Sequence, residues 1–303
     1  MYVATIELDG VNDDHIVLSD SNEAFGDEGM ELDVSPKGIF STAFKTRTES
    51  GAFTLGGRIV GEEVPIREVT MGINLFDMGS GIEDTIERFR RLWAVPGTRQ
   101  RKRSTRFTYT SELSGSRWLD LRLSQELSFS PEKDWSLQGF ARVVVSAIAV
   151  QPMYESEADV RSWTNPSSGT NTGWIPAWNP TDQDLFFSWA FDPATEWRFG
   201  DMSFGNEWYY KRPVGADANR WIISPTLTQR LYVNAGPMKR TYRSEDGSDA
   251  SGLFGGVEPL YWMPPHTGNA DNPVMIPVRC NGPAGATAAL KMRRLWSTEA
   301  GGE

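Results

Sequence analysis

Two histidines, His15 and His266, are the first candidates for chemistry, because imidazole is the side chain that most often acts as a general base near neutral pH. They lie far apart, His15 in a polar stretch and His266 in a proline-rich one. A hydrolytic triad needs its histidine beside a nucleophile and an orienting carboxylate. The sequence contains no G-x-S-x-G, H-E-x-x-H, Walker or G-x-G-x-x-G pattern. We therefore expect no catalytic residue and no enzymatic activity.

Carboxylates are the second candidates, since the chain contains 40 aspartates and glutamates. Pairs such as Glu126 with Glu132, or Asp182 with Asp184, could supply the acid and base of a glycosidase, but so many acids produce such pairs by chance. Residues 1–36 hold ten acids and no Lys or Arg. The segment 9–33 could suggest a calcium site through Asp13, Asp14, Asp20 and Asn22, yet the EF-hand order of ligands around a central glycine is missing. We expect a solvated acidic arm, with no metal and no cofactor.

The overall composition narrows the class of partner. Cys280 is the only cysteine, which excludes an intrachain disulfide and a cysteine-based metal site. A formal net charge of -10 disfavours nucleic acid and anionic membranes. The most apolar stretch, Val143–Val150, is too short to cross a bilayer. The expected partners are therefore other proteins.

Opposite charges are segregated in the first half of the chain. A basic cluster follows a predicted helix, and no ladder of aromatic residues accompanies it, so a nucleic-acid interface is disfavoured. The alternative is that the basic loop of one copy meets the acidic arm of another. The residues expected at inter-subunit or partner contacts are Arg99, Arg101, Lys102, Arg103, Asp13, Asp14, Asp27 and Glu28.

Most segments alternate between apolar and polar residues with a period of two, which predicts β-strands. Strands are therefore expected to position most of the candidate side chains named above. The clearest is Arg67–Leu75, in which Val69, Met71, Ile73 and Leu75 share one face. Residues 19–56 show no such period, and a stretch of that length predicts a functional loop or arm.

One amphipathic helix is predicted after this strand. The run Ser80–Glu83 has the S-x-x-E pattern of a capping box, and Pro96-Gly97 would end the helix. Spacings of four, three and four residues place the apolar side chains on one face. These side chains are Ile82, Ile86, Phe89 and Trp93.

The C-terminal half differs from the first half in its tryptophan content and in its pattern of short strands. Nine of the 12 tryptophans follow residue 160, and short strand candidates recur between turn signals, which favours a second antiparallel β-sandwich or jelly roll. The tryptophans suit a core or an interface, although a platform that stacks on sugars is the alternative. Residues 154–175 are polar and predict a linker or large loop.

Several segments stand in an order that is familiar from one protein family. In the first half the order is Ile66–Met71, Leu92–Gly97, Arg117–Leu123, Phe140–Val145 and Gln151–Tyr154. In the second half it is Asn179–Asp182, Leu231–Asn234, Arg243–Gly247, Pro264-Pro265 and Leu290–Trp296. This order resembles that of the distal tail proteins and related minor tail proteins of long-tailed siphophages, particularly those that infect actinobacteria.

The resemblance implies a mostly-β chain of two domains. Residues 1–153 would form a tail-tube-like β-sandwich with one α-helix, and residues 176–303 a galectin-like β-sandwich. The first domain would build a hexameric ring at the distal end of the tail tube, and residues 19–56 would be a candidate inter-subunit arm. Other expected partners are the tail tube protein and the tail-tip hub or tail-associated protein. The protein would be made in the host bacterial cytoplasm and located in the virion.

Two further expectations follow from this reading. DNA would pass through the ring without stable binding, repelled by lumen acids that we expect among residues 7–33. The resemblance brings no catalytic, metal or cofactor residues with it. The alternative function is a minor tail protein that recognises the host by binding carbohydrate through the tryptophan-rich second domain.

Overall fold

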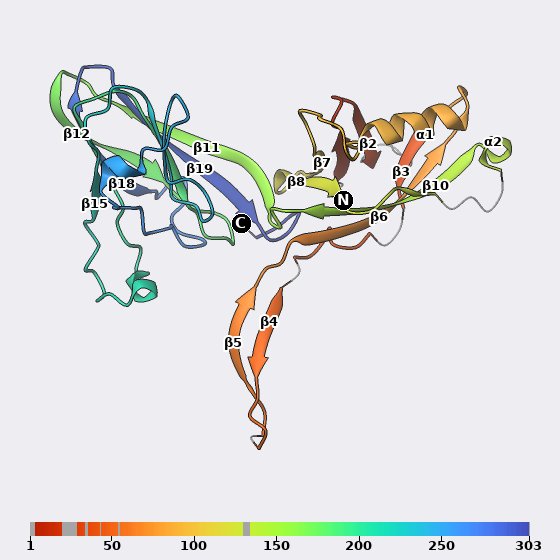
Figure 1. The fold of residues 1–303 in the computed structure, drawn as a ribbon, viewed down its shortest axis with the longest axis horizontal. Coiled ribbons are helices and arrows are strands. Elements are labelled where there is room, and N and C mark those ends of the chain that lie inside the picture. Colours follow the sequence, from red (N-terminus) through yellow and green to blue (C-terminus); the bar gives the residue numbers. More distant parts are fainter. Residues whose placement is uncertain are drawn as a thin grey trace. The chain divides into compact units, whose positions relative to one another are not determined.

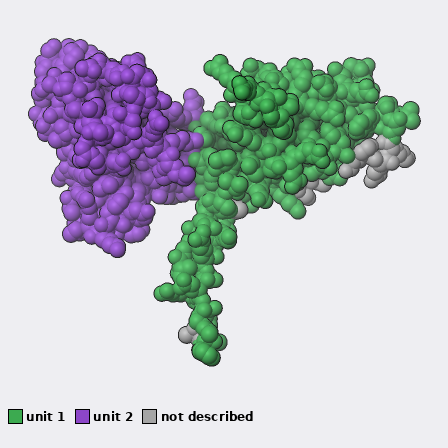
Figure 2. Space-filling view, viewed as in Figure 1, with its two compact units in different colours: residues 1–156, 296–301 green, residues 157–295, 302–303 purple. Residues whose placement is uncertain are grey.

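The computed structural model describes residues 4–19, 29–33, 36–42, 44–53, 55–129 and 134–302. The chain is mostly β, as predicted, and it divides into two compact units. Unit 1 comprises residues 1–156 and 296–301, and unit 2 comprises residues 157–295 and 302–303 (Figure 2). No helix in the described part of the chain is long and apolar enough to cross a membrane.

Unit 1 is built on an antiparallel sheet with the strand order β2-β1-β7-β8-β10-β6-β3, and β9 pairs with β10 beside it (Figure 1). The longest pairing joins β6 and β10 over ten residue pairs. The strands are β1 (Thr5–Asp9), β2 (His15–Ser19), β3 (Met30–Leu32), β6 (Arg67–Phe76), β7 (Thr105–Ser111), β8 (Gly115–Leu123), β9 (Ser128–Phe129) and β10 (Phe140–Ala149).

Helix α1 (Ile82–Arg91) packs on this sheet against β6 and β10. The apolar faces predicted from periodicity are confirmed on both sides of the contact. The alternate residues of β6, the apolar residues of α1 and Trp93 just after the helix are all buried: Val69, Met71, Ile73, Leu75, Ile82, Ile86, Phe89 and Trp93. Burying such side chains is the main force that holds a helix to a sheet, at about 1.5–3 kcal/mol for each large one.

The predicted start of this helix is wrong in detail. The N-cap is Gly81, which makes no side-chain capping bond, so Ser80 and Glu83 do not form a capping box. Asp77 replaces it, because its Oδ1 accepts hydrogen bonds from the backbone N–H groups of Gly79 and Gly81 at 2.7 and 2.8 Å. The helix also ends at Arg91, before the Pro96-Gly97 pair.

A second helix of one turn, α2 (Trp135–Gln138), corrects the expectation of a single helix in unit 1. Asp134 caps its start by accepting a hydrogen bond from Ser136 N at 3.0 Å, and Gly139 ends it in the left-handed conformation with φ 61°. Four residues are too few to show a helical period, which explains why the sequence pattern did not reveal it.

Unit 2 contains two antiparallel sheets. One has the order β17-β16-β13-β19-β11, and the other has the order β12-β18-β14-β15. The strands are β11 (Tyr154–Thr164), β12 (Gly169–Ala177), β13 (Phe187–Phe191), β14 (Glu196–Gly200), β15 (Trp221–Ile223), β16 (Leu231–Asn234), β17 (Tyr242–Ser244), β18 (Val274–Gly282) and β19 (Thr287–Trp296). Two 3₁₀ helices, η2 (Glu207–Tyr210) and η3 (Ser251–Phe254), lie in its loops.

Aromatic side chains from both sheets form the core of unit 2. The ring centroids of Phe191 on β13 and Phe199 on β14 are 5.0 Å apart, and Trp197 lies 5.3 Å from Phe191. Trp189 and Trp197 are buried, so part of the tryptophan enrichment serves the core as expected. Residues 154–175, expected to be a linker or loop, instead form β11 and most of β12, because their polar residues occupy exposed positions of these strands.

The C-terminal residues Trp296–Gly301 belong to unit 1, although the predicted second domain included them. The Trp296 indole is buried, and the Cζ atom of Arg117 lies 3.7 Å from its centroid. Arg117 Nη1 donates to the Thr298 carbonyl at 3.1 Å, and Arg67 Nη2 donates to the Ser297 carbonyl at 2.8 Å. Two buried arginines therefore depend on this segment for hydrogen-bond acceptors.

Candidate interaction surfaces

A two-stranded hairpin leaves the body of unit 1 between β3 and β6 (Figure 1). It consists of β4 (Lys45–Glu49) and β5 (Arg58–Glu63), which pair with each other in a sheet of only two strands. Salt bridges between the strands help to hold it together, including one of 3.0 Å between Arg58 Nη2 and Glu49 Oε2. An isolated hairpin of this kind is only marginally stable in water.

Apolar side chains are exposed along this hairpin and beside it. Ile59 is 65% exposed and Val60 is 47% exposed, while Phe53 and Leu55 near the tip are fully exposed. The outer edges of both strands also carry backbone groups that no third strand satisfies among the described residues. A projecting segment with exposed apolar residues and open edges has the features of a surface that another chain covers.

The sequence prediction of an arm within residues 19–56 is close to this segment but displaced from it, because the hairpin extends to Glu63 and β3 pairs with β6 in the body of unit 1. Lys45–Glu49 alternates threonine with charged residues, so it lacks the apolar period that identifies a strand. Ile59 and Val60 lie in a segment whose strand signal the sequence does show, but their exposure was not predicted. The available signal was their position in a short β-branched run between glycines.

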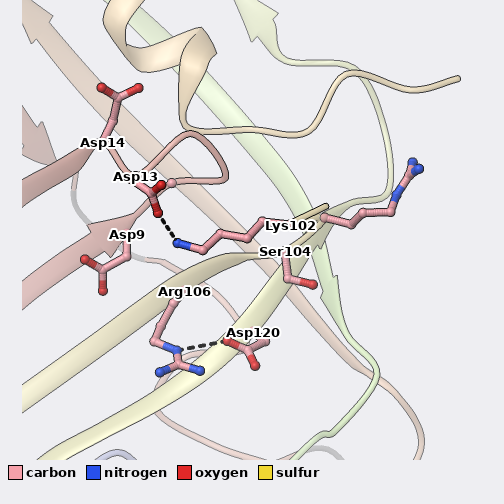
Figure 3. A pocket seen from close by; sticks show the side chains of 9 residues that line it. Asp9, Asp13, Asp14, Lys102, Ser104, Arg106 and Asp120 are labelled. Carbon is pink, nitrogen blue, oxygen red and sulfur yellow. Dashed lines mark hydrogen bonds and ion pairs between the residues drawn. The ribbon is translucent and has the colours of Figure 1, made fainter. Parts of the chain in front are cut away.

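A charged pocket lies where the β1–β2 turn meets the loop before β7 (Figure 3). Its volume is about 490 Å³. Its charged lining consists of the carboxylates of Asp9, Asp13, Asp14 and Asp120 and the cations of Lys102, Arg103 and Arg106. Arg106 Nε and Asp120 Oδ1 are 3.0 Å apart. No grouping able to hold a metal ion occurs among the residues that the structure describes.

The predicted contact residues are partly brought together here, within one chain. Lys102 Nζ forms a salt bridge with Asp13 Oδ1, and Arg91 Nη2 lies 3.3 Å from Asp14 Oδ1. Arg103 donates to the Thr98 carbonyl at 2.8 Å.

The other predicted contact residues are not in the pocket. Arg99 and Arg101 are exposed and do not line it, and Asp27 and Glu28 lie outside the described residues. The two charge blocks thus meet in the folded chain, and pairing between copies stays a prediction.

The Asp13–Lys102 pair gives a direct test of this local arrangement. The hydrogen bond from Lys102 and its charge lower the pKa of Asp13. Lys102→Ala is expected to raise that pKa towards the ordinary aspartate value, measured by NMR titration of the side-chain carboxyl carbon. Because both groups are exposed, the melting temperature is expected to change little. An Asp13 pKa unaltered by the substitution would contradict the pairing.

Neither histidine ring is hydrogen-bonded to a nucleophilic side chain in the described part of the chain. His15 is exposed on β2, and its Nδ1 lies 2.9 Å from Asp9 Oδ1. His266 occupies a left-handed turn with φ 51°, and its backbone N–H donates to the Thr181 carbonyl at 3.1 Å.

Glu132, one member of the carboxylate pairs considered above, lies outside the described residues. Burial raises the pKa of Asp184 in the other pair.

Comparison with solved structures finds the same fold in the Dit protein of phage SPP1, whose structure is described as a paradigm of the hub adsorption apparatus in phages that infect Gram-positive bacteria. The TM-score is 0.55 at 13% sequence identity, and the match covers 97% of this chain and 99% of that chain. At this identity the likeness establishes the fold.

Two structures of the phage P2 baseplate in its activated conformation, one with calcium and one with strontium, also match. Their TM-scores are 0.42 and 0.43, at 11% and 12% identity, with coverage of 96% of this chain and 98% of each matched chain. These scores are below the level at which a shared fold is inferred. No protein-family model matches the sequence, and neither does any curated protein.

Proposed function

We propose that this protein is a non-enzymatic structural component of a long-tailed phage virion. Its copies form a ring of six members at the distal end of the tail tube. The ring joins the tube to the baseplate or tail-tip hub. The proposal is supported by the fold shared with SPP1 Dit over nearly the whole of both chains. Because function does not follow from fold alone, the proposal also rests on one further observation.

That observation is the β4–β5 hairpin. In the proposed ring, the hairpin of each copy lies against the next copy, which covers Ile59, Val60 and the apolar tip and extends a neighbouring sheet by β-augmentation. Such a contact is head-to-tail, since the hairpin of one chain meets a different surface of the next. Head-to-tail contacts close into rings when the rotation between copies divides a full turn.

The charge of the lumen determines how the ring interacts with the DNA that passes through it. In this proposal the lumen is lined by acidic residues and repels DNA, so the genome passes without stable binding. The partners of the ring are the tail tube protein on one side and the tail-tip hub or tail-associated protein on the other. In this proposal the second unit is a galectin-like domain, and the protein is made in the host bacterial cytoplasm before it enters the virion.

Electron microscopy of the purified full chain, combined with light scattering for mass, tests the proposal. The expected result is a closed ring with a central opening and a mass of six times the 33.8 kDa chain. The protein is also expected to bind purified tail tube protein. A monodisperse monomer at tens of micromolar that also fails to bind tail tube protein would overturn the proposal.

A further inference from the structure

Arg67 occupies a position in β6 where the alternation of the strand predicts an apolar side chain. It is the first member of the core-facing row that continues with Val69 and Met71, and it is 1% exposed. Removing a guanidinium from water is costly unless hydrogen bonds replace the lost solvation. A buried arginine at this place is therefore expected to hold other parts of the chain in position.

Two short legs join the β4–β5 hairpin to the body of unit 1 (Figure 1). Residues 38–42 lie on the β4 side, and residues 64–66 connect β5 directly to Arg67. Neither leg is part of a strand. Because no ladder of backbone hydrogen bonds continues through the legs, the angle between the hairpin and the body depends on the other contacts that the legs make.

The guanidinium of Arg67 ties the two legs together. Its Nη1 donates to the carbonyls of Gly38 and Ile39 at 3.3 and 3.2 Å. Its Nη2 donates to Thr42 Oγ1. The Tyr154 hydroxyl adds a hydrogen bond to the Ile39 carbonyl at 3.2 Å, and its ring centroid lies 4.9 Å from Arg67 Cζ. Since Arg67 directly follows the second leg, one buried side chain connects both attachments of the hairpin.

The same guanidinium also holds the C-terminal segment, residues 296–301. Arg67 Nη2 donates to the Ser297 carbonyl at 2.8 Å, and the Thr42 hydroxyl donates to that same carbonyl. A hydroxyl accepts one hydrogen bond while it donates another, so Thr42 serves both partners at once. These three groups, which we call the Arg67 clamp, join a leg of the hairpin to a residue 255 positions away.

We propose that the Arg67 clamp sets the angle of the hairpin and makes that angle depend on the C-terminal segment. Arg67 and Thr42 are positioning residues, which hold the hairpin in the direction in which it meets the next copy. When the segment leaves its place, both residues lose the Ser297 carbonyl as an acceptor, and the hairpin pivots on its legs. Copies in this state enter the ring less readily. The inference deepens the proposed function and rests on it for the role of the hairpin in the ring.

Thr42→Val tests the clamp, because valine keeps the shape of threonine and lacks the hydroxyl. Spin labels at Ser50→Cys beside the hairpin and Glu87→Cys on α1, both exposed positions, report the angle of the hairpin. Double electron–electron resonance measures their separation in an Ile59→Asp chain, whose added charge on the hairpin is expected to keep it monomeric. We expect a narrow distance distribution in this parent chain and a broader one once Thr42→Val is added.

Hydrogen exchange measured by mass spectrometry tests the link to the C-terminal segment in the same chains. Thr42→Val is expected to speed the exchange of residues 296–301 about two- to tenfold, the effect of losing one hydrogen bond. Thr42→Ser keeps the hydroxyl and is expected to match the parent chain in both measurements. Thr48→Val makes the same chemical change on β4, beyond the legs, and is also expected to match the parent. Cys280 is buried, and a chain without added cysteines checks that it takes no label.

Equal results for Thr42→Val and Thr42→Ser, in either the distance distribution or the C-terminal exchange, would overturn the clamp. Ring assembly is measured separately in chains that keep Ile59, where Thr42→Val is expected to raise the concentration needed for assembly about tenfold. Normal assembly with a released hairpin would overturn the link between hairpin angle and ring. If the wild type forms no ring while Thr42→Val still releases the hairpin, the proposed function fails and the clamp stands.

Discussion

Replacing residues 45–63 with a short Gly-Ser turn is expected to abolish ring assembly and leave a folded monomer. The replacement is geometrically simple, because Lys45 and Glu63 are paired at the base of the hairpin. The body of unit 1 loses no partner strand, since β4 and β5 pair with each other in a separate two-stranded sheet. Size-exclusion chromatography with light scattering would measure the mass, and circular dichroism would report the fold.

The expected size of this effect comes from the apolar side chains of the hairpin. Burying each of Phe53, Leu55 and Ile59 against a neighbour contributes about 1.5–3 kcal/mol. Losing the three contacts weakens each interface on the order of a thousandfold or more, after the cost of ordering the side chains is subtracted. Such a loss is enough to change a stable ring into monomers at micromolar concentration.

A pair of point variants separates the hairpin from general surface effects. Ile59→Asp places a charge on the hairpin and is expected to prevent assembly. Leu113→Asp makes the same change at another exposed apolar residue of unit 1, in the turn between β7 and β8, and is expected to assemble normally. Rings formed by the hairpin deletion, with the same mass as the wild type, would show that the hairpin is not the assembly element.

Deleting residues 296–303 is expected to unfold unit 1, although its strands are far away in the sequence. Trp296 is buried in unit 1, and losing a buried tryptophan side chain costs about 3–5 kcal/mol. Arg67 and Arg117, 1% and 0% exposed, would lose the carbonyls of Ser297 and Thr298. A hydrogen bond to a charged group is worth about 1.5–3 kcal/mol. The total approaches the whole stability of a domain, about 5–15 kcal/mol.

Hydrogen exchange measured by mass spectrometry would show where stability is lost. In the deletion variant, we expect rapid exchange in β6 and β8 and retained protection in β13 and β14. Deletion of Gly302 and Glu303 alone is the control and is expected to behave as the wild type. Wild-type protection of β6 and β8 in the longer deletion would disprove the stabilising role of the segment.

Elements with a strong local period were predictable from the sequence. The alternation in β6 and the spacing of Ile82, Ile86 and Phe89 in α1 each required a buried face, and the structure confirms both. The N-terminus of α1 was not predictable in detail, because Ser80–Glu83 matches a capping box, yet the backbone path makes Gly81 the N-cap and brings its N–H to Asp77 Oδ1 instead.

Features that depend on residues distant in the sequence were not predictable. Asp13 and Lys102 are 89 positions apart, so charge segregation alone could not show that they pair within one chain. The strands β11 and β12 were not recognised in the sequence, because their many polar residues, which are exposed in the fold, obscure the apolar period of a strand.

The return of the C-terminal segment to unit 1 determines the order in which the protein can mature on the ribosome. The chain leaves unit 1 along β11 and comes back at the end of β19, so unit 2 is inserted within unit 1. The unit that emerges first is therefore completed late, since Arg67 and Arg117 gain the carbonyls of Ser297 and Thr298 only after residues 157–295 of unit 2 have been synthesised. A nascent chain that stops before Trp296 therefore leaves unit 1 incomplete, even when most of unit 2 has been made.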